Sequence, residues 1–454
     1  MSELKFQERA YNPAVLFIWM VGTLLALGAI YDGIDYIWGK GWALDELRTI
    51  LQLVIVDDDS WWPMYNAAKA RLLNAGVYQT VFFEERMKFQ YPPLSILPFI
   101  FFIKIGMSWE TIREVMNAIS FASILLMVAI VYSLIVILFK RFPISGKFDW
   151  KYKIPFFVIS LIGTFSFDAI VRAQYLGQIQ VILDLLVCLA FLLLLLNQKY
   201  FSGACLALAA LVKPQLTLLF LWALIRKEKE IMIGMIAVFV PAGALSLYVF
   251  GFSEHVQYLE TLSLMGKHGE AYWPNQSING LLHRLLSDVD ALTFPVNSYA
   301  PYNPFIYGAT IVTTVMLILL GLFFRPESSS RGLSQDRKLT GYSLDMATML
   351  LLVTMASPIA WYHHYGIVWP FYVAAFVVLC CLPSIRRSWQ TIVIGSLLSA
   401  SFLLLSNRFP ALTSEAFSAP PINLLLSHYL FGAFLFLAAL LMLRRTLAGE
   451  YRNN

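Results

Sequence analysis

Long apolar segments separated by shorter polar ones make up most of this 454-residue chain. Many of them run to about 20 residues, the length that an α-helix needs to cross the hydrocarbon of a bilayer. Polar residues gather between these segments and do not alternate with apolar ones over stretches of about ten residues, as in membrane β-barrels. The pattern therefore predicts an all-α integral membrane protein with a single polytopic domain over residues 1–454.

About eleven to thirteen transmembrane helices are expected from these segments. The segment 93–107 is a weaker candidate, and it opens on Pro92-Pro93. The first run, Ala14 to Tyr31, lacks a small-residue cleavage site, so we expect an anchor there and no cleaved signal peptide. The candidate spans are 14–31, 93–107, 115–139, 154–168, 179–196, 201–225, 231–252, 305–324, 342–356, 366–382, 390–406 and 422–443.

Basic residues between the spans orient the C-terminal half. Arg325 to Lys338, Arg386-Arg387 and Arg444-Arg445 are expected to face the cytoplasm, because loops rich in Lys and Arg are retained there. This arrangement places 253–304 and the turn from Ser357 to His364 on the opposite side of the membrane, together with 407–421.

The N-terminal half allows two topologies. If 93–107 spans the membrane, the basic loop Lys140 to Lys153 falls outside, against the positive-inside rule. If it does not span, that loop is cytoplasmic, and 201–225 must then break in the middle. Lys213-Pro214 is a suitable break, because proline removes a helix hydrogen bond and lysine avoids hydrocarbon.

Two long segments are predicted on the extracytoplasmic side. The first, 32–92, is rich in Trp, Tyr and charge, and its stretch Met64 to Leu73 has the pattern of an amphipathic helix in the interface. The second, 253–304, carries three histidines with Trp273 and Asn275. Long loops on a rigid helical scaffold are where binding and chemistry usually lie.

Composition excludes several other classes of function. Hydrophobic residues make up 59% of the chain and charged ones 13%, and the net charge of +5 is explained by basic loops, so nucleic-acid binding is not expected. All four cysteines lie within apolar runs, which argues against a disulfide framework or a thiolate metal site. No glycine-rich nucleotide motif is visible, which disfavours a cytosolic nucleotide-sugar donor.

Three consecutive carboxylates, Asp57, Asp58 and Asp59, follow an apolar run and precede Trp61-Trp62. Acidic side chains at a bilayer boundary repel one another and are costly to desolvate. A carboxylate placed there can take the proton from an acceptor hydroxyl during inverting sugar transfer. The alternative is a solvated acidic turn that caps a helix, since Asp is favoured at that position.

Further polar groups interrupt later apolar runs. Arg172 and Lys213 are candidate contacts for a lipid phosphate, because cations near the membrane face form charge-assisted hydrogen bonds with phosphate. A structural role explains either residue equally well. In that role the cationic side chain extends to the membrane interface, and buried amides such as Gln178 form hydrogen bonds between helices. His363 and His364 are candidates for a phosphate or a sugar hydroxyl. A metal site at this pair is only weakly indicated, because adjacent side chains on a helix diverge.

Taken in order, these residues resemble the bacterial polyprenol-phosphate-mannose-dependent α-1,2-mannosyltransferase-like family of superfamily C (GT-C) glycosyltransferases. The resemblance runs from about Asp57 to Pro370, and it is carried by the ordered set of motifs. They are the acidic cluster, Tyr65 with Ala67-Ala68, Gly76 and Tyr78, Phe89 with Tyr91-Pro92-Pro93-Leu94, Gly177-Gln178, Gly203 to Leu211 before Lys213-Pro214-Gln215, Asn275-Gln276-Ser277, and Ser357-Pro358 with Trp361 and His363-His364.

The resemblance implies a GT-C-type helical bundle with a large first extracytoplasmic loop and an active site on that face. It also implies a polyprenyl-phosphate sugar donor, often mannose, and an Asp in the first loop as general base. The family places this Asp about four residues before the tyrosine, where this chain has Trp61, so an insertion must be assumed. Asp58 and Asp59 are then the nearest carboxylates, and Asp57 is the most distant. His363 or His364 would line the donor site.

We therefore expect a membrane-embedded hexosyltransferase of the cell inner membrane that acts on a lipid or glycan acceptor. Tyr91, Gln178 and Asn275 would help to position donor or acceptor, and membrane lipids would be its other partners. No cofactor is expected, and a divalent metal is possible but not indicated. Two rival functions are a transporter or flippase for lipid-linked glycans, which should show repeats and midmembrane charges, and a ligase that transfers a whole glycan.

Overall fold

The computed structural model describes residues 12–38, 42–54, 57–142, 150–295, 297–324, 335–382 and 388–450, and these ranges contain helices and no strand. The nearest feature to a sheet is an isolated bridge between Asn275 and Trp361. Seven helices in the described ranges are long and apolar enough to cross a membrane, or eight when one bent pair is counted. The predicted all-α integral membrane fold is therefore confirmed.

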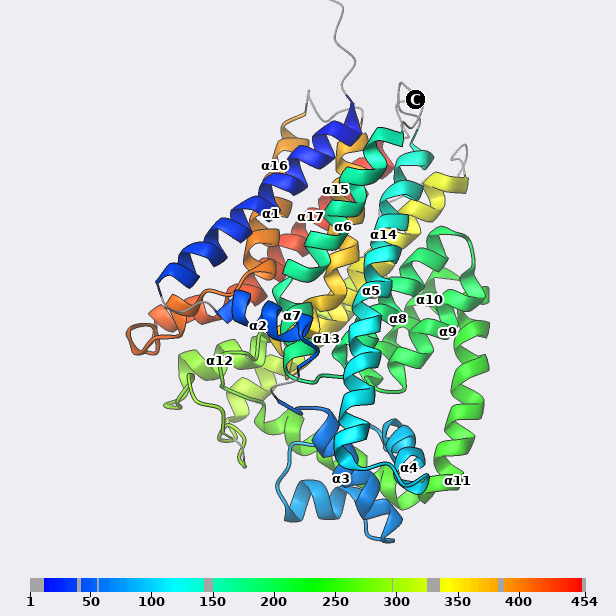
Figure 1. The fold of residues 1–454 in the computed structure, drawn as a ribbon, viewed down its shortest axis with the longest axis vertical. Helices are drawn as coiled ribbons and strands as arrows, with labels where there is room; N and C mark the ends of the chain where they lie inside the picture. Colours follow the sequence, from blue (N-terminus) through cyan, green and yellow to red (C-terminus); the bar gives the residue numbers. More distant parts are fainter. Residues whose placement is uncertain are drawn as a thin grey trace, which may run out of the picture.

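The α-helices follow one another in chain order with short 3-10 or π-helical turns (η) between some of them (Figure 1). Their bounds are α1 Pro13–Ile37, α2 Trp42–Leu51, α3 Trp61–Leu72, α4 Leu97–Lys104, α5 Trp109–Arg141, α6 Lys153–Ser166, α7 Asp168–Tyr175, α8 Gln180–Leu195, α9 Lys199–Ala210, α10 Leu218–Arg226, α11 Lys229–His268, α12 Ile278–Leu286, α13 Pro304–Phe323, α14 Gln335–Met355, α15 Trp369–Cys381, α16 Trp389–Ser406 and α17 His428–Glu450. The η turns are η1 Gln79–Glu84, η2 Pro93–Ile96, η3 Trp150–Tyr152, η4 Pro214–Thr217, η5 Tyr362–Val368, η7 Pro410–Thr413, η8 Glu415–Phe417 and η9 Ile422–Ser427.

Cationic side chains fasten together the end of the bundle at which α10, α13 and α17 end, which we call the basic end. Arg226 of α10 and Arg444 of α17 both bind the carboxylate of Asp345 in α14, each at 2.5 Å. Arg226 also donates to backbone carbonyls at the C-terminus of α13, including that of Leu322 at 2.5 Å. Buried charges of this kind are tolerated because each is paired and hydrogen-bonded. The basic segments 325–334 and Arg386-Arg387 lie outside the described residues.

The N-terminal half follows the second of the two topologies considered above. Arg141, in the last turn of α5, donates to the carbonyl of Leu195 at the end of α8, so both helices end at the basic end. Lys199 at the start of α9 pairs with Glu228, just before α11, at 2.7 Å. Helices α9 and α10 therefore enter the bundle and return to the same end, and the break between them falls at Lys213-Pro214 as predicted.

The expected span 93–107 is corrected by the structure. After η2 it contains only α4, whose 8 residues extend about 12 Å and cannot cross a bilayer. A proline stands in the first turn of both elements, Pro93 in η2 and Pro98 in α4, and the regular α-helix begins only at Leu97. The segments 201–225, which is folded back on itself, 179–196, whose helix α8 has 16 residues, and 342–356 are likewise not among the candidate spans of the described residues, so their number is lower than the eleven to thirteen expected.

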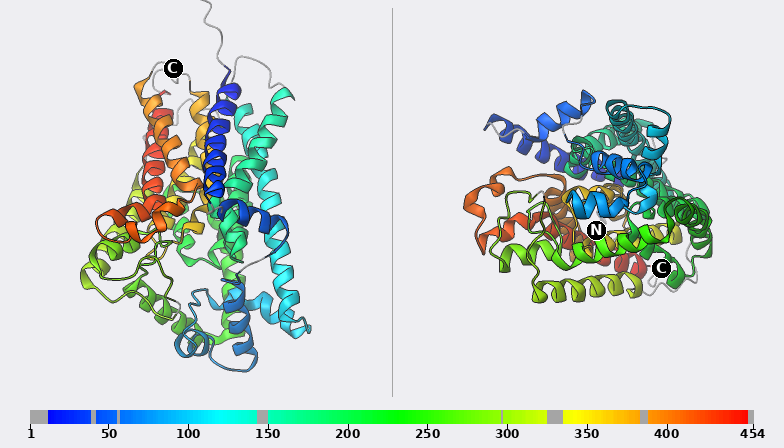
Figure 2. Two further views of the ribbon diagram at one scale, coloured as in Figure 1. Left: turned by 60° about the vertical axis from the view of Figure 1, so that its left-hand side comes forward. Right: turned by 90° about the horizontal axis from the view of Figure 1, so that it is seen from below.

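The two long segments that the sequence predicts on the extracytoplasmic side contain more helix than the sequence indicated. In 32–92, α2 lies across the bundle and α3 covers its lower end, close to the amphipathic stretch predicted at Met64 to Leu73 (Figure 2). In 253–304, residues up to His268 continue α11 beyond a break at Gly251, where φ is +77°. We call the end of the bundle that carries α3, α4 and α12 the loop end (Figure 1).

Close packing of α9 against α11 depends on glycine. A Cβ atom added at Gly203 would lie 2.2 Å from the carbonyl oxygen of Ile231, which is backbone and cannot move aside easily. We expect Gly203→Ala to lower the free energy of unfolding by about 1–3 kcal/mol, the usual range for overpacking. Thermal unfolding in detergent measures the change. Gly243→Ala, in the partner helix α11 and with nothing within 4 Å of the added Cβ, is the matched control and should be neutral or slightly stabilising. Equal losses in both variants would contradict this packing.

Candidate active site

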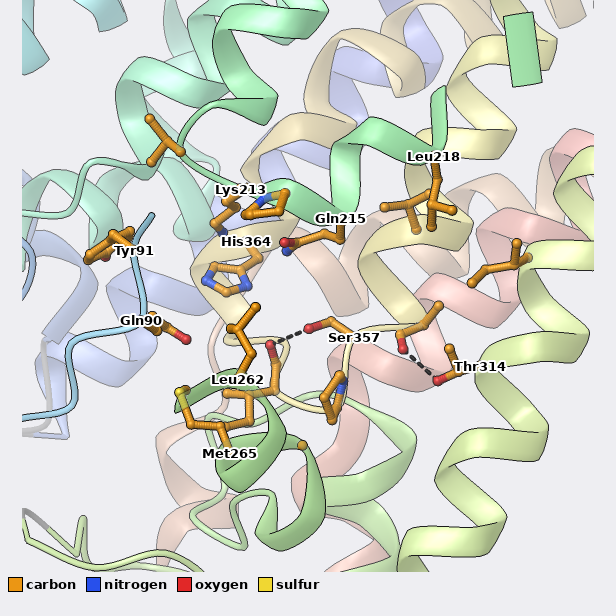
Figure 3. Close-up of a pocket in the computed structure, with 18 of the residues that line it drawn as sticks. Gln90, Tyr91, Lys213, Gln215, Leu218, Leu262, Met265, Thr314, Ser357 and His364 are labelled. Atoms are coloured by element: carbon orange, nitrogen blue, oxygen red, sulfur yellow. Dashed lines mark hydrogen bonds between the residues drawn. The ribbon is translucent and has the colours of Figure 1, made fainter. Parts of the chain in front are cut away.

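Two adjoining cavities lie among the residues singled out from the sequence. The first, which we call the acidic cavity, has a volume of about 230 Å³ and is lined by Asp57, Asp59 and Arg172 among others. The second, the apolar cavity, has a volume of about 330 Å³ and is lined mainly by hydrophobic side chains, with Lys213 and His364 among them (Figure 3). Both cavities are lined by Gln90, Tyr91, Met265 and Ile359, so they meet at these residues.

Asp59 is held by a chain of hydrogen bonds that starts on the opposite wall. The Nε2 of Gln178 donates to Oδ2 of Asp59 at 2.5 Å, and the Oε1 of Gln178 accepts from the Ser60 hydroxyl at 2.7 Å. Ser60 lies 2.7 Å from the hydroxyl of Tyr91. Because both ends of the Gln178 amide are used, its orientation is fixed, and with it the position of the carboxylate.

The backbone also joins the two segments. The amide nitrogens of Asp59 and Ser60 donate to the carbonyls of Leu176 and Gly177, at 3.0 and 3.2 Å. Gly177 adopts a φ of +63°, a left-handed conformation that is strained for residues with a Cβ, and it ends α7 sharply enough to expose both carbonyls. The Gly177-Gln178 pair therefore places Asp59 through both backbone and side chain.

The environment of Asp59 makes it a stronger base than an ordinary carboxylate. Its side chain is accessible to solvent from the cavity, yet protein atoms surround it closely, and this desolvation raises its pKa to about 6. The charge of Asp57 adds to the increase, whereas the hydrogen bond from Gln178 and the charges of Arg172 and Lys88 oppose it. At neutral pH such a group is mostly ionised but holds a proton more tightly than a free aspartate does.

The other two aspartates are placed differently. Asp58 pairs with Arg113 of α5 at 2.6 Å, and it does not line either cavity. Asp57 lines the acidic cavity with an exposed side chain, and its Oδ1 accepts the backbone N–H of Asp58 at 2.8 Å. Of the three, only Asp59 is both inside a cavity and fixed by a side-chain donor from another element.

Arg172 reaches the acidic cavity but is already engaged. Its guanidinium donates to Glu46 of α2 and, at 2.5 Å, to the hydroxyl of Tyr362. Glu46 is buried and also accepts two hydrogen bonds from Arg408, at 3.0 and 2.8 Å, and Arg408 in turn pairs with Asp168 at 2.7 Å. This network of two cations and two carboxylates is balanced in charge, which explains how it is tolerated inside the bundle.

Two of the candidate phosphate contacts, Lys213 and His364, line the apolar cavity. Figure 3 shows the side chains of Lys213, Gln215 and His364 close together, and Lys213 donates to the Oε1 of Gln180. His363 faces the acidic cavity instead, and both of its ring nitrogens are buried without a hydrogen-bond partner in the structure. Such a side chain needs a partner, and a bound ligand can provide one.

Asn275 does not reach either cavity. It is fully buried, its Nδ2 donates to the carbonyls of Glu270 and Pro358, and its Oδ1 accepts from the backbone of Ala360 at 2.9 Å. This amide therefore joins the 270–277 segment to the turn that precedes η5. It holds the wall of the site in place without touching the space where a substrate would lie.

Lys88 and Glu270 were not recognised from the sequence. The ammonium of Lys88 pairs with Glu270 at 2.6 Å and lies over the rings of Phe294 and Tyr299, at 4.3 and 4.8 Å from their centroids. Burial lowers the pKa of Lys88, although Glu270 opposes the change. The only available signal was that Lys88 directly precedes the Phe89 to Leu94 motif, since its partner is 182 residues away.

Among the described residues, no group of three or more His, Cys, Asp or Glu side chains is arranged to hold a metal ion. The pair His363-His364 consequently lacks a third protein ligand in that part of the chain. A metal site built from this pair, the weak alternative in the sequence, gains no support from the geometry.

Comparison with known proteins adds one match. The family model described as glycosyltransferase family 87 matches residues 89–358, which is more than half of the chain. The matched part includes Tyr91, Arg172, Gln178 and Lys213, whereas the three aspartates precede it and the two histidines follow it. No curated protein and no solved structure matches the chain.

The hydrogen bond from Gln178 should be measurable as a change in the pKa of Asp59. We expect the protonated carboxyl band of Asp59 in infrared spectra to be half developed near pH 6, and Gln178→Leu to move that point to higher pH, because the donor stabilises the charged form. Asp59→Asn identifies the band by removing it. A midpoint close to about 4, the value of an ordinary Asp, would show that the site is not desolvated.

Proposed function

The chain belongs to glycosyltransferase family 87, and we propose that it transfers a sugar, with mannose as the first candidate, from a polyprenyl-phosphate donor to a lipid or glycan acceptor. In this proposal the reaction inverts the anomeric carbon, Asp59 is the general base, and the site faces the extracytoplasmic side of the cell inner membrane. The observation that carries it is one carboxylate, fixed by Gln178, that lines a polar cavity adjoining an apolar one that contains a lysine.

Asp59 has the properties that a base for this reaction needs. As the acceptor oxygen attacks the anomeric carbon, its proton passes to the carboxylate, and the bond between the sugar and the lipid phosphate breaks with its electron pair on the phosphate. A base is most effective when its pKa lies close to the working pH, and the pKa of Asp59 is raised to about 6. Asp58 lines neither cavity, and Asp57 is not held by a side-chain donor from another element in the described ranges.

The apolar cavity suits the donor. Its wall of hydrophobic side chains from α10, α11, α13 and α14 can take the first part of a polyprenyl chain, and Lys213 and His364 then face the phosphate. A cation in a cavity with few waters stabilises the negative charge that develops on the departing phosphate more strongly than it would in solution. The sugar would reach the junction lined by Gln90 and Tyr91, next to Asp59.

The remaining residues would position these groups. Arg172 and His363 line the acidic cavity, where His363 has two unsatisfied nitrogens for a sugar hydroxyl or a phosphate oxygen. Tyr91 and Gln178 hold Asp59 through the chain that runs over Ser60. Asn275 would act indirectly, by fixing the loop that carries part of the wall. The exchange of one phosphate bond for a glycosidic bond supplies the driving force, so the proposal requires no ATP.

Substitution of the aspartates tests the base. Asp59→Asn should lower the rate of sugar transfer by about 10²–10⁴-fold in vesicles supplied with polyprenyl-phosphate mannose, the usual contribution of a general base. Asp58→Asn, which removes a carboxylate from the same turn but outside the cavities, is the matched control and should retain most activity. Full activity in Asp59→Asn would refute the assignment, and movement of lipid without transfer of sugar would favour the flippase.

The same base predicts a pH dependence. Only ionised Asp59 can accept a proton, so kcat/KM should rise with pH through about 6 and level off above it. The rise follows from the direction of the shift, because a raised pKa moves the protonated, inactive form to higher pH. Initial rates measured from about pH 4.5 to 8 would show the rise. A rate that is constant over this range would contradict a titrating base.

A further inference from the structure

Asp184 is a buried carboxylate that the proposed chemistry leaves unused. It lies in α8 with a relative exposure of 1%, and its Oδ2 atom has no hydrogen-bond partner in the structure. Its Oδ1 atom accepts from the Nε2 of Gln180, one helical turn earlier, at 2.6 Å. An ionisable group retained at such a position is costly, so it calls for a function.

The contacts with Asp184 and Lys213 together fix which way the amide of Gln180 points. Its NH₂ group donates to the carboxylate of Asp184, so its Oε1 atom faces the other side. That oxygen accepts the hydrogen bond from the ammonium of Lys213. Asp184 thus acts on Lys213 through a neutral group placed between them.

The neutral group matters for the charge of Lys213. Arg172, the other candidate phosphate contact, pairs directly with the carboxylate of Glu46. The ammonium of Lys213 instead donates to the amide oxygen of Gln180, which orients the ammonium without forming an ion pair. A lysine held in this way keeps more of its charge for an anion that enters the apolar cavity.

The same carboxylate also contacts the turn that carries the two histidines. A Cβ atom added at Gly366 in η5 would lie 2.1 Å from Oδ2 of Asp184, so the carboxylate packs directly against the backbone there. Gly366 is two residues after His364. Asp184 therefore contacts both Gln180, which binds Lys213, and the η5 turn, which carries His364. Lys213 and His364 line the same cavity.

We propose that Asp184 is a positioning residue that sets Lys213 and His364 relative to one another as a binding site for the phosphate of a lipid. It acts on Lys213 through Gln180 and on His364 through the packing at Gly366, and it does not touch the lipid itself. This inference rests on the proposed function, since it takes the phosphate of the donor to occupy the apolar cavity.

Binding of undecaprenyl phosphate to the purified full-length protein in lipid nanodiscs tests the proposal, with undecaprenol as the probe that lacks the phosphate. Asp184→Asn should weaken phosphate-lipid binding about tenfold, because Asn can present either its oxygen or its NH₂ group to Gln180 and so no longer fixes the amide beside Lys213, and one hydrogen bond to a charged group is worth about that factor. Gln180→Glu should weaken it further, since a carboxylate would neutralise Lys213. Binding of undecaprenol should be unchanged in both variants.

Gln174→Leu and Gln180→Leu form a matched pair. Gln174 is an equally buried amide on α7, but it binds Asn117 and lines neither cavity. A general effect of removing a buried amide would appear in both variants, whereas the proposal expects weaker phosphate-lipid binding only for Gln180→Leu. Equal losses would overturn it.

A double substitution separates positioning from misfolding. Gly366→Ala should displace the Asp184 carboxylate and weaken phosphate-lipid binding, whereas Asp184→Ala removes the clash, so the double variant should bind no more weakly than Asp184→Ala alone. Additive losses would overturn the contact. If the wild type binds undecaprenyl phosphate no better than undecaprenol, the proposed donor and this inference both fail. If every variant prefers undecaprenyl phosphate to undecaprenol as strongly as the wild type does, the proposed donor stands and Asp184 has no positioning role.

Discussion

The hydrogen bond between Gln178 and Asp59 is the interaction on which the rest of the candidate site depends. It joins the first long loop to the turn between α7 and α8, and the backbone bonds from Asp59 and Ser60 to Leu176 and Gly177 reinforce the same junction. Other contacts, such as the pair between Asp58 and Arg113, also fasten the loop to the helices, but this junction is the one that places Asp59 in the acidic cavity. Because desolvation and Asp57 raise the pKa of Asp59 while Gln178 lowers it, the bond also sets how strong a base the carboxylate is.

Cations inside the bundle are accommodated in three different ways. At the basic end, Arg226 and Arg444 share Asp345 and several carbonyls, an arrangement that only fastens helices together. Arg172 is paired with Glu46 in a balanced network next to the acidic cavity. Lys213 alone of these four has an amide oxygen as its partner. Of these four cations, the one without a carboxylate partner is therefore the one that lines the apolar cavity.

The sequence predicts some of this arrangement well and some of it poorly, for physical reasons. Hydrophobic segment length is enough to predict the helical membrane fold, and the combination of Lys with Pro is enough to place the break at Lys213-Pro214. The sequence does not reveal that the helix within 93–107 is too short to cross a bilayer, since the apolar residues of a short helix resemble those of a membrane span. Nor does it separate three adjacent aspartates, because only their distant partners, Gln178 and Arg113, distinguish them. Lys88 is not recognisable from the sequence for the same reason, because its partner Glu270 is 182 residues away.

The positions that carry candidate chemistry are also those where helices are interrupted. Lys213 stands between α9 and η4, Gln178 follows the left-handed Gly177, and the two histidines lie in the η5 turn before α15. An interruption inside a membrane domain leaves backbone groups without helical partners, so it is stable only where protein or a water-filled cavity surrounds it. The same condition allows a polar side chain to face a substrate. The breaks and the functional groups therefore occur together because both require a cavity within the bundle.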